Sequence, residues 1–267
     1  MRAEVDRLTQ LGPLAAYRVA AGRSRPDGRR VVFLHGFTQN AACMGPTGPI
    51  LAREHDVIAV DLPGHGHSGV YSGVDLWHSA ELVQQTAGTG CYVGYSMGGR
   101  VALHLALSHP SAVQALVLIG ATAGIDDDDA RADRAGQDLE NAAKLEHLGT
   151  EAFVREWLEQ PLFATLPGSA RFEAERGTND ASGLAESLRN CGTGSMESLW
   201  ARLDQISCPV LIISGELDLK FTELAALMAE RIGTNAKAVV VPDAGHSVHL
   251  ERPEACSESI SAFLAEL

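Results

Sequence analysis

The sequence lacks a long hydrophobic run. No segment of its 267 residues approaches the roughly 20 consecutive apolar residues that a membrane-spanning helix needs. It also lacks a basic stripe, and its net charge of −13 argues against nucleic acid as a partner. Residues 1–20 lack a basic segment followed by an apolar core and a small-residue cleavage site, so no signal peptide is predicted. We therefore expect neither a membrane nor nucleic acid as a partner.

No pair of cysteines is spaced as CxxC. The five cysteines are scattered, at positions 43, 91, 191, 208 and 256, which is typical of buried, reduced thiols and favours a cytoplasmic protein. The segment from His65 to His67 has the pattern His-x-His, but no Cys or carboxylate cluster with ligand spacing accompanies it. We interpret that segment as a structured turn and predict no metal and no cofactor.

Short apolar runs alternate with helical patterns over most of the chain. Such alternation predicts an α/β fold, in which a mostly parallel central sheet carries helices on both faces. The hydrophobic content of 45% is enough for one sizeable core. The predicted strands are residues 31–34, 57–60, 91–94, 115–119, 210–213 and 238–241, and the predicted helices are residues 76–88, 97–109, 221–231 and 254–265.

The alternation stops between residues 122 and 204, a polar segment with helical patterns. It resumes after Cys208. We interpret residues 122–204 as a helical cap inserted between two parts of the core, residues 1–121 and 205–267. The acidic run 126–129 predicts the N-terminus of a cap helix, where carboxylates favour the helix dipole, rather than a metal site.

A candidate nucleophile lies in the stretch from Gly94 to Arg100, which reads GYSMGGR. A strand, then Ser96 flanked by glycines, then a helix fits the G-x-S-x-G nucleophile elbow, whose turn is too tight for side chains at the neighbouring positions. Ser96 would then be exposed at the end of the sheet. The backbone N–H of Met97 would lie beside it at the start of the helix.

A nucleophilic serine needs a base and an acid, and on this type of fold the acid follows the serine in the chain and the histidine base follows the acid. Asp218 follows the predicted strand 210–213, and Glu216 is its nearest rival as the acid. His246 follows the predicted strand 238–241 in a glycine-led loop, and His249 is the rival base on the same segment. We predict that His246 accepts the serine proton while Asp218 orients the imidazole.

The second oxyanion donor should come from the loop after the first buried strand. His35, Gly36 and Phe37 follow that strand, so we assign the backbone N–H of Phe37 to this role, together with that of Met97. We interpret His35 as a structural histidine of the loop.

Through these motifs, the chain resembles the α/β-hydrolase superfamily over nearly its whole length. The matching motifs are LHGF, DLPGHGHS, GYSMGG, GELD and AGHSVHLERP. They imply the fold and the triad, but not the reaction, because esterases, thioesterases, C–C hydrolases and lyases share them.

Further stretches, mostly in the predicted cap, resemble one family more narrowly, the 2-succinyl-6-hydroxy-2,4-cyclohexadiene-1-carboxylate synthases of menaquinone biosynthesis. They are GYSMGGR, RADRAGQD, REWLEQPLFATL, ERGTNDASGLAESLRNCGTGSMESLW and GELDLKF. This resemblance implies a lyase that eliminates pyruvate from 2-succinyl-5-enolpyruvyl-6-hydroxy-3-cyclohexene-1-carboxylate. It implies a small anionic cyclohexene carboxylate as the partner, and we expect the protein to be a monomer.

The substrate that this resemblance implies carries three carboxylates. In so acidic a protein, the binding pocket must supply positively charged side chains to hold them. Arg100 lies four residues after Ser96 on the same helix face, so it can hold a carboxylate near the serine. The resemblance adds Arg134 and Arg176 as further cations, and Tyr95, Trp157 and Phe163 as pocket residues. The alternatives are an ion pair of Arg100 with a cap glutamate, exposed helix arginines at 134 and 176, and a plain cap core around Trp157. The roles of Lys220 and Phe221, which belong to the same pattern, stay open.

Two rival functions remain at this level. A serine hydrolase, either an esterase or a C–C bond hydrolase, would use the same three residues through an acyl-enzyme. A non-catalytic ligand receptor on this fold has no need of a nucleophile on a strained turn, so the Ser96, Asp218 and His246 set argues against it.

Overall fold

A single sheet organises the protein. The computed structural model describes residues 5–8, 12–19 and 28–267, so part of the predicted first core segment 1–121 lies outside the described residues. Within them the sheet is eight-stranded, with the order β1-β2-β4-β3-β5-β6-β7-β8. The six strands β3 to β8 run parallel to their neighbours among themselves. Strand β2 is antiparallel to both β1 and β4. The strands are β1 (Val5–Leu8), β2 (Ala16–Val19), β3 (Arg30–Leu34), β4 (Asp56–Val60), β5 (Gly90–Tyr95), β6 (Val113–Ile119), β7 (Val210–Gly215) and β8 (Ala236–Val241).

The predicted strands are confirmed as β3 to β8, and the mostly parallel α/β fold with them. The antiparallel pair β1 and β2 was not predicted. Each of these strands has only four residues and carries charged side chains, so neither gives the continuous apolar run of a buried parallel strand.

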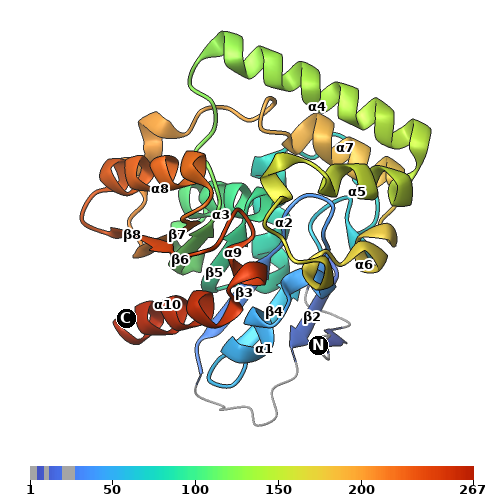
Figure 1. Ribbon diagram of the computed structural model, residues 1–267. Coiled ribbons are helices and arrows are strands. Elements are labelled where there is room, and N and C mark those ends of the chain that lie inside the picture. Colours follow the sequence, from blue (N-terminus) through green and yellow to red (C-terminus); the bar gives the residue numbers. More distant parts are fainter. Residues whose placement is uncertain (1–4, 9–11, 20–27) are drawn as a thin grey trace.

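Helices cover both faces of the sheet because successive strand residues point to opposite sides. Val32 and Leu34 of β3 pack with α2, α3 and α8 on one face, whereas Val31 and Phe33 pack with α1 and α10 on the other. Figure 1 shows this layering, with α10 and α1 below the sheet and α2 and α3 behind it. The helices outside the cap are α1 (Thr47–Leu51), α2 (Leu76–Ala87), α3 (Met97–Ser108), α8 (Leu219–Ile232), α9 (Val248–Glu251) and α10 (Pro253–Ala265).

Residues between β6 and β7 add no strand to the sheet and form a helical layer. Its helices are α4 (Asp128–Leu148), α5 (Thr150–Leu158), α6 (Glu173–Gly177) and α7 (Ala181–Cys191). They enclose an apolar cluster of their own, built around Leu145, Phe153 and Leu184. In Figure 1, α4, α5 and α7 lie at the top of the molecule, above the sheet. The division of the chain at residues 121/122 and 204/205 stays a prediction.

Aspartates begin several helices and explain where they start. The carboxylate of Asp127 accepts the Ala130 N–H at 2.8 Å and caps α4, inside the acidic run that was predicted to begin a helix. Asp75 caps α2 in the same way, and Asp218 caps α8. The last of these caps matters for the site, because it fixes the position of a candidate acid.

Two global features accompany this fold. In the part of the chain that the structure describes, no helix is long and apolar enough to cross a membrane. All five cysteines are free thiols; four are buried and Cys208 is partly exposed. Burial raises the pKa of Cys43, Cys191 and Cys208 to about 11. They are therefore thiols rather than thiolates at neutral pH.

Candidate active site

Ser96 lies at a sharp turn between β5 and α3, with φ 49° and ψ −109°. The turn is possible because glycines flank it: a Cβ on Gly98 would lie 2.2 Å from the Leu34 carbonyl oxygen, and one on Gly94 would lie 2.5 Å from the Gly98 carbonyl oxygen. A positive φ on a serine is strained, and only close packing of strand and helix holds it there. The packing thus presents Ser96 at the carboxyl end of the parallel strands.

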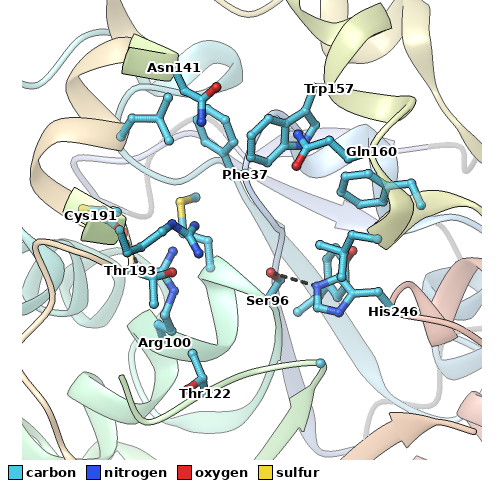
Figure 2. Close-up of a pocket in the computed structure, with 18 of the residues that line it drawn as sticks. Phe37, Ser96, Arg100, Thr122, Asn141, Trp157, Gln160, Cys191, Thr193 and His246 are labelled. Atoms are coloured by element: carbon cyan, nitrogen blue, oxygen red, sulfur yellow. Dashed lines mark hydrogen bonds between the residues drawn. The ribbon is translucent and has the colours of Figure 1, made fainter. Parts of the chain in front are cut away.

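Ser96, His246 and Asp218 form a hydrogen-bonded chain. His246 Nε2 lies 3.2 Å from Ser96 Oγ, and His246 Nδ1 lies 2.8 Å from Asp218 Oδ2. Figure 2 shows the first of these contacts as a dashed line. The second oxygen of Asp218 accepts the Phe221 N–H at 3.4 Å as the cap of α8, so the helix start aims the carboxylate at the imidazole. This arrangement can pass a proton from the serine to the histidine.

The rival acid and the rival base lie elsewhere. Glu216 accepts the backbone N–H of Asp243 at 3.2 Å and contacts neither histidine. His249 is fully buried, with its ring 4.3 Å from that of Tyr95, and neither ring nitrogen has a partner among the described residues. Burial lowers the pKa of His249 to about 3, so it is neutral. Of the two histidines, the geometry brings only His246 to Ser96.

Phe37 and Met97, the two predicted oxyanion donors, line the same cavity as Ser96. Met97 is the first residue of α3, so its N–H has no acceptor within the helix. Neither it nor the N–H of Phe37 finds an acceptor among the residues that the structure describes. The loop that carries Phe37 is held by His35, whose Nδ1 lies 2.9 Å from the Gly36 carbonyl oxygen and whose Nε2 accepts the Leu62 N–H. His35 is thus structural, and burial lowers its pKa to about 4.

A cavity of about 240 Å³ opens in front of Ser96 and is enclosed by the helical layer. Its wall comes from the ends of β3, β5, β6 and β8 and the loops after them, from α3 and α8, and from the helical layer. All six residues that the family resemblance or the helix face assigned to substrate binding line it, namely Tyr95, Arg100, Arg134, Trp157, Phe163 and Arg176.

Arg100 is a buried cation without a carboxylate. It donates from Nη1 to the Cys191 carbonyl oxygen at 2.5 Å, and it forms no ion pair with any described residue, so the predicted alternative of a cap glutamate is not found. Burial lowers its pKa to about 10, which leaves it charged at neutral pH. Figure 2 shows Arg100 beside Cys191 and Thr193, across the cavity from His246. A desolvated charge facing a cavity is poised to bind an anion.

Arg176 is more deeply buried, at 1% exposure. It donates to the carbonyl oxygen of Arg171 at 2.8 Å and to the hydroxyl of Thr38, while its Nη2 has no partner among the described residues. Burial lowers the pKa of Arg176 as well. Two buried guanidinium groups without carboxylates in one cavity are unfavourable in the free protein, and an anionic ligand would relieve both.

Arg134 differs from these two because it is already paired. Its Nε donates to Asp138 Oδ1 at 2.8 Å, and the side chain is 35% exposed. Asp138 also accepts the Gly194 N–H at 3.1 Å, which ties α4 to the segment after α7. The two remaining nitrogens of Arg134 are left for the cavity that it lines.

Aromatic rings form the opposite wall. The ring of Trp157 lies 5.1 Å from that of Phe37 and 6.3 Å from that of Phe163. Its indole nitrogen is buried and has no acceptor among the described residues, although a buried indole N–H normally has one. Phe163 also meets the His246 ring edge-on at 6.4 Å. Tyr95 instead donates to or accepts from Ser247 at 2.7 Å, and its ring supports His246 at 5.4 Å.

Sequence reasoning missed several lining residues or left them without a role. Gln137 and Asn141 share the cavity-facing side of α4 with Arg134, at the spacing of successive helix turns, which is the signal that could have revealed them. Gln160 follows α5 and gives no signal of its own. Lys220 lines the cavity, and the ring of Phe221 packs 4.5 Å from that of His246 and restricts its rotation.

The two histidines of the His-x-His segment contact other side chains of the fold. His65 packs its ring 4.9 Å from that of His35, and His67 lies 2.7 Å from the Tyr17 hydroxyl. Among the described residues, no group of three or more His, Cys, Asp or Glu side chains could hold a metal ion.

This fold and this serine site define a class of protein. The model of the alpha/beta hydrolase family matches residues 31–259, and the chain belongs to that family.

Within this family, the chain is similar to proteins that share one name. The chain is 34% identical to a Bacillus subtilis protein provisionally named 2-succinyl-6-hydroxy-2,4-cyclohexadiene-1-carboxylate synthase, over 89% of this chain and 90% of the relative. It is 32% identical to the synthase of that name from Escherichia coli O1:K1, over 91% and 97% of the two chains. The solved structure of MenH from S. aureus superposes with a TM-score of 0.86 at 30% identity, covering 94% of this chain and 98% of the other. The resemblance to these synthases is thereby confirmed.

Proposed function

We propose that this protein is a 2-succinyl-6-hydroxy-2,4-cyclohexadiene-1-carboxylate synthase, a lyase that eliminates pyruvate from 2-succinyl-5-enolpyruvyl-6-hydroxy-3-cyclohexene-1-carboxylate. The observation that carries the proposal is the placement of Arg100 and Arg176, buried and without carboxylate partners, in the same cavity as Ser96. A substrate with three carboxylates matches these charges. The names of the relatives support the same reaction.

The proposed reaction begins with removal of a proton from the carbon next to the succinyl ketone. Ser96 Oγ takes that proton as it gives its own to His246 Nε2, and Asp218 stabilises the imidazolium through Nδ1. The electron pair of the broken C–H bond moves to the ketone oxygen and forms an enolate. The N–H groups of Phe37 and Met97 stabilise this oxygen, in the role they would have in ester cleavage.

Collapse of the enolate then breaks the C–O bond to the enolpyruvyl group in a 1,4-elimination. The ring keeps the new double bond, and the leaving group takes up a proton, which the imidazolium can supply, and departs as pyruvate. No acyl-enzyme is needed. Arg100, Arg134 and Arg176 hold the carboxylates so that the reacting carbon faces Ser96. Trp157, Phe163 and Tyr95 line the rest of the cavity.

A coupled assay for pyruvate tests the proposal. Wild type should release pyruvate from the enolpyruvyl substrate, and Ser96→Ala should lower kcat by several orders of magnitude, since the base is removed. Ser108→Ala is the matched control, because Ser108 is exposed at the far end of the same helix and should leave kcat unchanged. Ser96→Ala at near-wild-type rate would remove Ser96 from the role of base.

The rival function, a serine hydrolase, predicts a different outcome. A burst of p-nitrophenol from p-nitrophenyl acetate, acylation of Ser96 and no pyruvate from the enolpyruvyl substrate would replace the lyase by an esterase or a C–C bond hydrolase. We expect slow ester turnover instead.

A further inference from the structure

Thr38, directly after Phe37, has an unusual backbone conformation. Its φ is 65°, in the left-handed region that glycine tolerates and β-branched residues avoid. Thr38 is fully buried in the loop after β3. A strained, β-branched residue next to a proposed oxyanion donor needs a structural cause, and strain of this kind persists only where the surroundings hold it.

The surroundings that hold Thr38 come from the end of α6 and from the segment that joins it to α7. Arg176 Nη1 donates to the Thr38 hydroxyl, and Asn179 Nδ2 donates to the Thr38 carbonyl oxygen at 2.7 Å. The same Arg176 nitrogen lies 3.5 Å from the Phe37 carbonyl oxygen. Hydrogen bonds from Arg176 and Asn179 thus hold the hydroxyl and the carbonyl oxygen of Thr38 and the carbonyl oxygen of the residue before it.

The orientation of the Asn179 amide is itself fixed. Its Oδ1 accepts the Gly66 N–H at 2.6 Å, so the donor end must face Thr38. Its Nδ2 also donates to the Arg176 carbonyl oxygen at 2.9 Å. Asn179 is 4% exposed, so water does not replace these bonds readily. Asn179 is therefore built to support the loop after β3 and does not line the cavity.

We infer that Asn179 is a positioning residue for the oxyanion hole: it holds Thr38 in the left-handed conformation and thereby aims the Phe37 N–H at the developing enolate. The torsion at Thr38 decides how the Gly36–Thr38 backbone lies against the helical layer. Without the Asn179 bond, Thr38 relaxes to negative φ and rotates the peptides before it, including the one that carries the Phe37 N–H. The helical layer therefore completes the catalytic machinery as well as covering the substrate. This inference rests on the proposed function of Phe37.

Substitution of Asn179 should act on kcat. Loss of one oxyanion donor lowers kcat by about 100- to 1000-fold, so partial misplacement of the Phe37 N–H in Asn179→Ala should lower it by roughly 10-fold or more. KM should change by less than about 3-fold, because Arg100 and Arg134 make their hydrogen bonds elsewhere and Arg176 keeps its bond to the Arg171 carbonyl oxygen. The matched control is Asn190→Ala. It removes an asparagine of α7, in the same helical layer, whose amide donates only to Glu186. It should keep the wild-type kcat.

A double-mutant cycle with Thr38→Gly separates positioning from general damage to the cap. Glycine accepts positive φ without strain, so Asn179→Ala should lower kcat by no more than about 3-fold in the Thr38→Gly background. An equal loss in both backgrounds, a change confined to KM, or a similar loss in Asn190→Ala would each overturn the inference. Thermal unfolding checks that each variant folds. If Asn179→Ala does not, Asn179→Asp, which keeps the acceptor for Gly66, takes its place in the cycle.

A second measurement distinguishes this inference from the proposed reaction. A fluorophosphonate labels an activated serine: Ser96 Oγ bonds to phosphorus, fluoride leaves, and the phosphoryl oxygen occupies the oxyanion hole. If wild type releases no pyruvate, the lyase fails. The labelling rate of Ser96 then still decides the role of Asn179. The positioning role is supported if Asn179→Ala lowers the labelling rate of Ser96 and this loss largely disappears in the Thr38→Gly background. An unchanged labelling rate in Asn179→Ala overturns it.

Discussion

Replacing Arg100 by methionine should separate stability from activity. The side chain is 7% exposed and has no ion-pair partner among the described residues. The fall of its pKa from 12.5 to about 10 corresponds to about 3 kcal/mol of unfavourable desolvation in the folded state at neutral pH. Methionine has a similar reach and removes this penalty, but it also removes a charged hydrogen bond to Cys191, worth about 1.5–3 kcal/mol.

The balance of these effects predicts a variant that is as stable as wild type or more stable. We expect the free energy of unfolding, measured with urea, to change by about 0 to +2 kcal/mol for Arg100→Met, since replacing a buried charge by an apolar side chain is often neutral or stabilising. We expect kcat/KM for pyruvate release to fall by about 10- to 150-fold, the equivalent of 1.5–3 kcal/mol for a lost charged hydrogen bond to substrate.

The control is Arg189→Met. Arg189 carries the same charge on α7 but is on the surface, paired with Glu146 at 2.7 Å and Glu186 at 3.3 Å. It should keep kcat/KM. A loss of more than about 2 kcal/mol of stability in Arg100→Met, with unchanged kcat/KM, would show that Arg100 serves the fold and would refute the reasoning.

Two further predictions concern the buried indole and the buried histidines. Trp157→Phe keeps an aromatic ring but removes the unpartnered indole N–H, so kcat/KM should fall by about 3- to 10-fold with an unchanged melting temperature; a full wild-type kcat/KM would mean that the N–H does not bind substrate. Burial lowers the pKa of His35 and His104 to about 4 and of His65 and His249 to about 3. The unfolded chain titrates near pH 6.5, so it binds more protons below that pH, and stability is lost as the pH falls from 6.5 towards 4. Urea unfolding should show a loss of about 5 kcal/mol between pH 7.5 and 5.5, about a quarter less in His249→Leu; an equal loss in that variant would contradict the assignment.

The amino-acid sequence determined the elements that depend on local patterns. Apolar runs between helical patterns were sufficient for β3 to β8 and for the four predicted helices, because buried parallel strands have few polar residues. The sharp turn around Ser96 was also predictable from the sequence, since only glycine fits beside such a turn. The sequence did not reveal β1 and β2, because each has only four residues and charged residues interrupt its apolar pattern.

Only the tertiary structure decided which distant side chains share a space. The sequence favoured His246 over His249 and Asp218 over Glu216, but the distances that join these residues to Ser96 come from the folded chain, because His246 lies 150 residues after Ser96 and 28 after Asp218. Likewise, Arg100 could have paired with a cap glutamate, and the folded chain leaves it without one. Sequence gives a residue's charge, but desolvation and partners arise from packing.

The support of Thr38 illustrates the same division most clearly. A threonine predicts extended or helical backbone, so the sequence alone argues against a positive φ at this position. The hydrogen bonds from Arg176 and Asn179 reverse that preference, and they exist because the end of α6 and the segment after it fold against the loop after β3. Local chemistry fixed the strands and the nucleophilic turn, whereas long-range packing fixed the site's charges and the aim of its backbone donors.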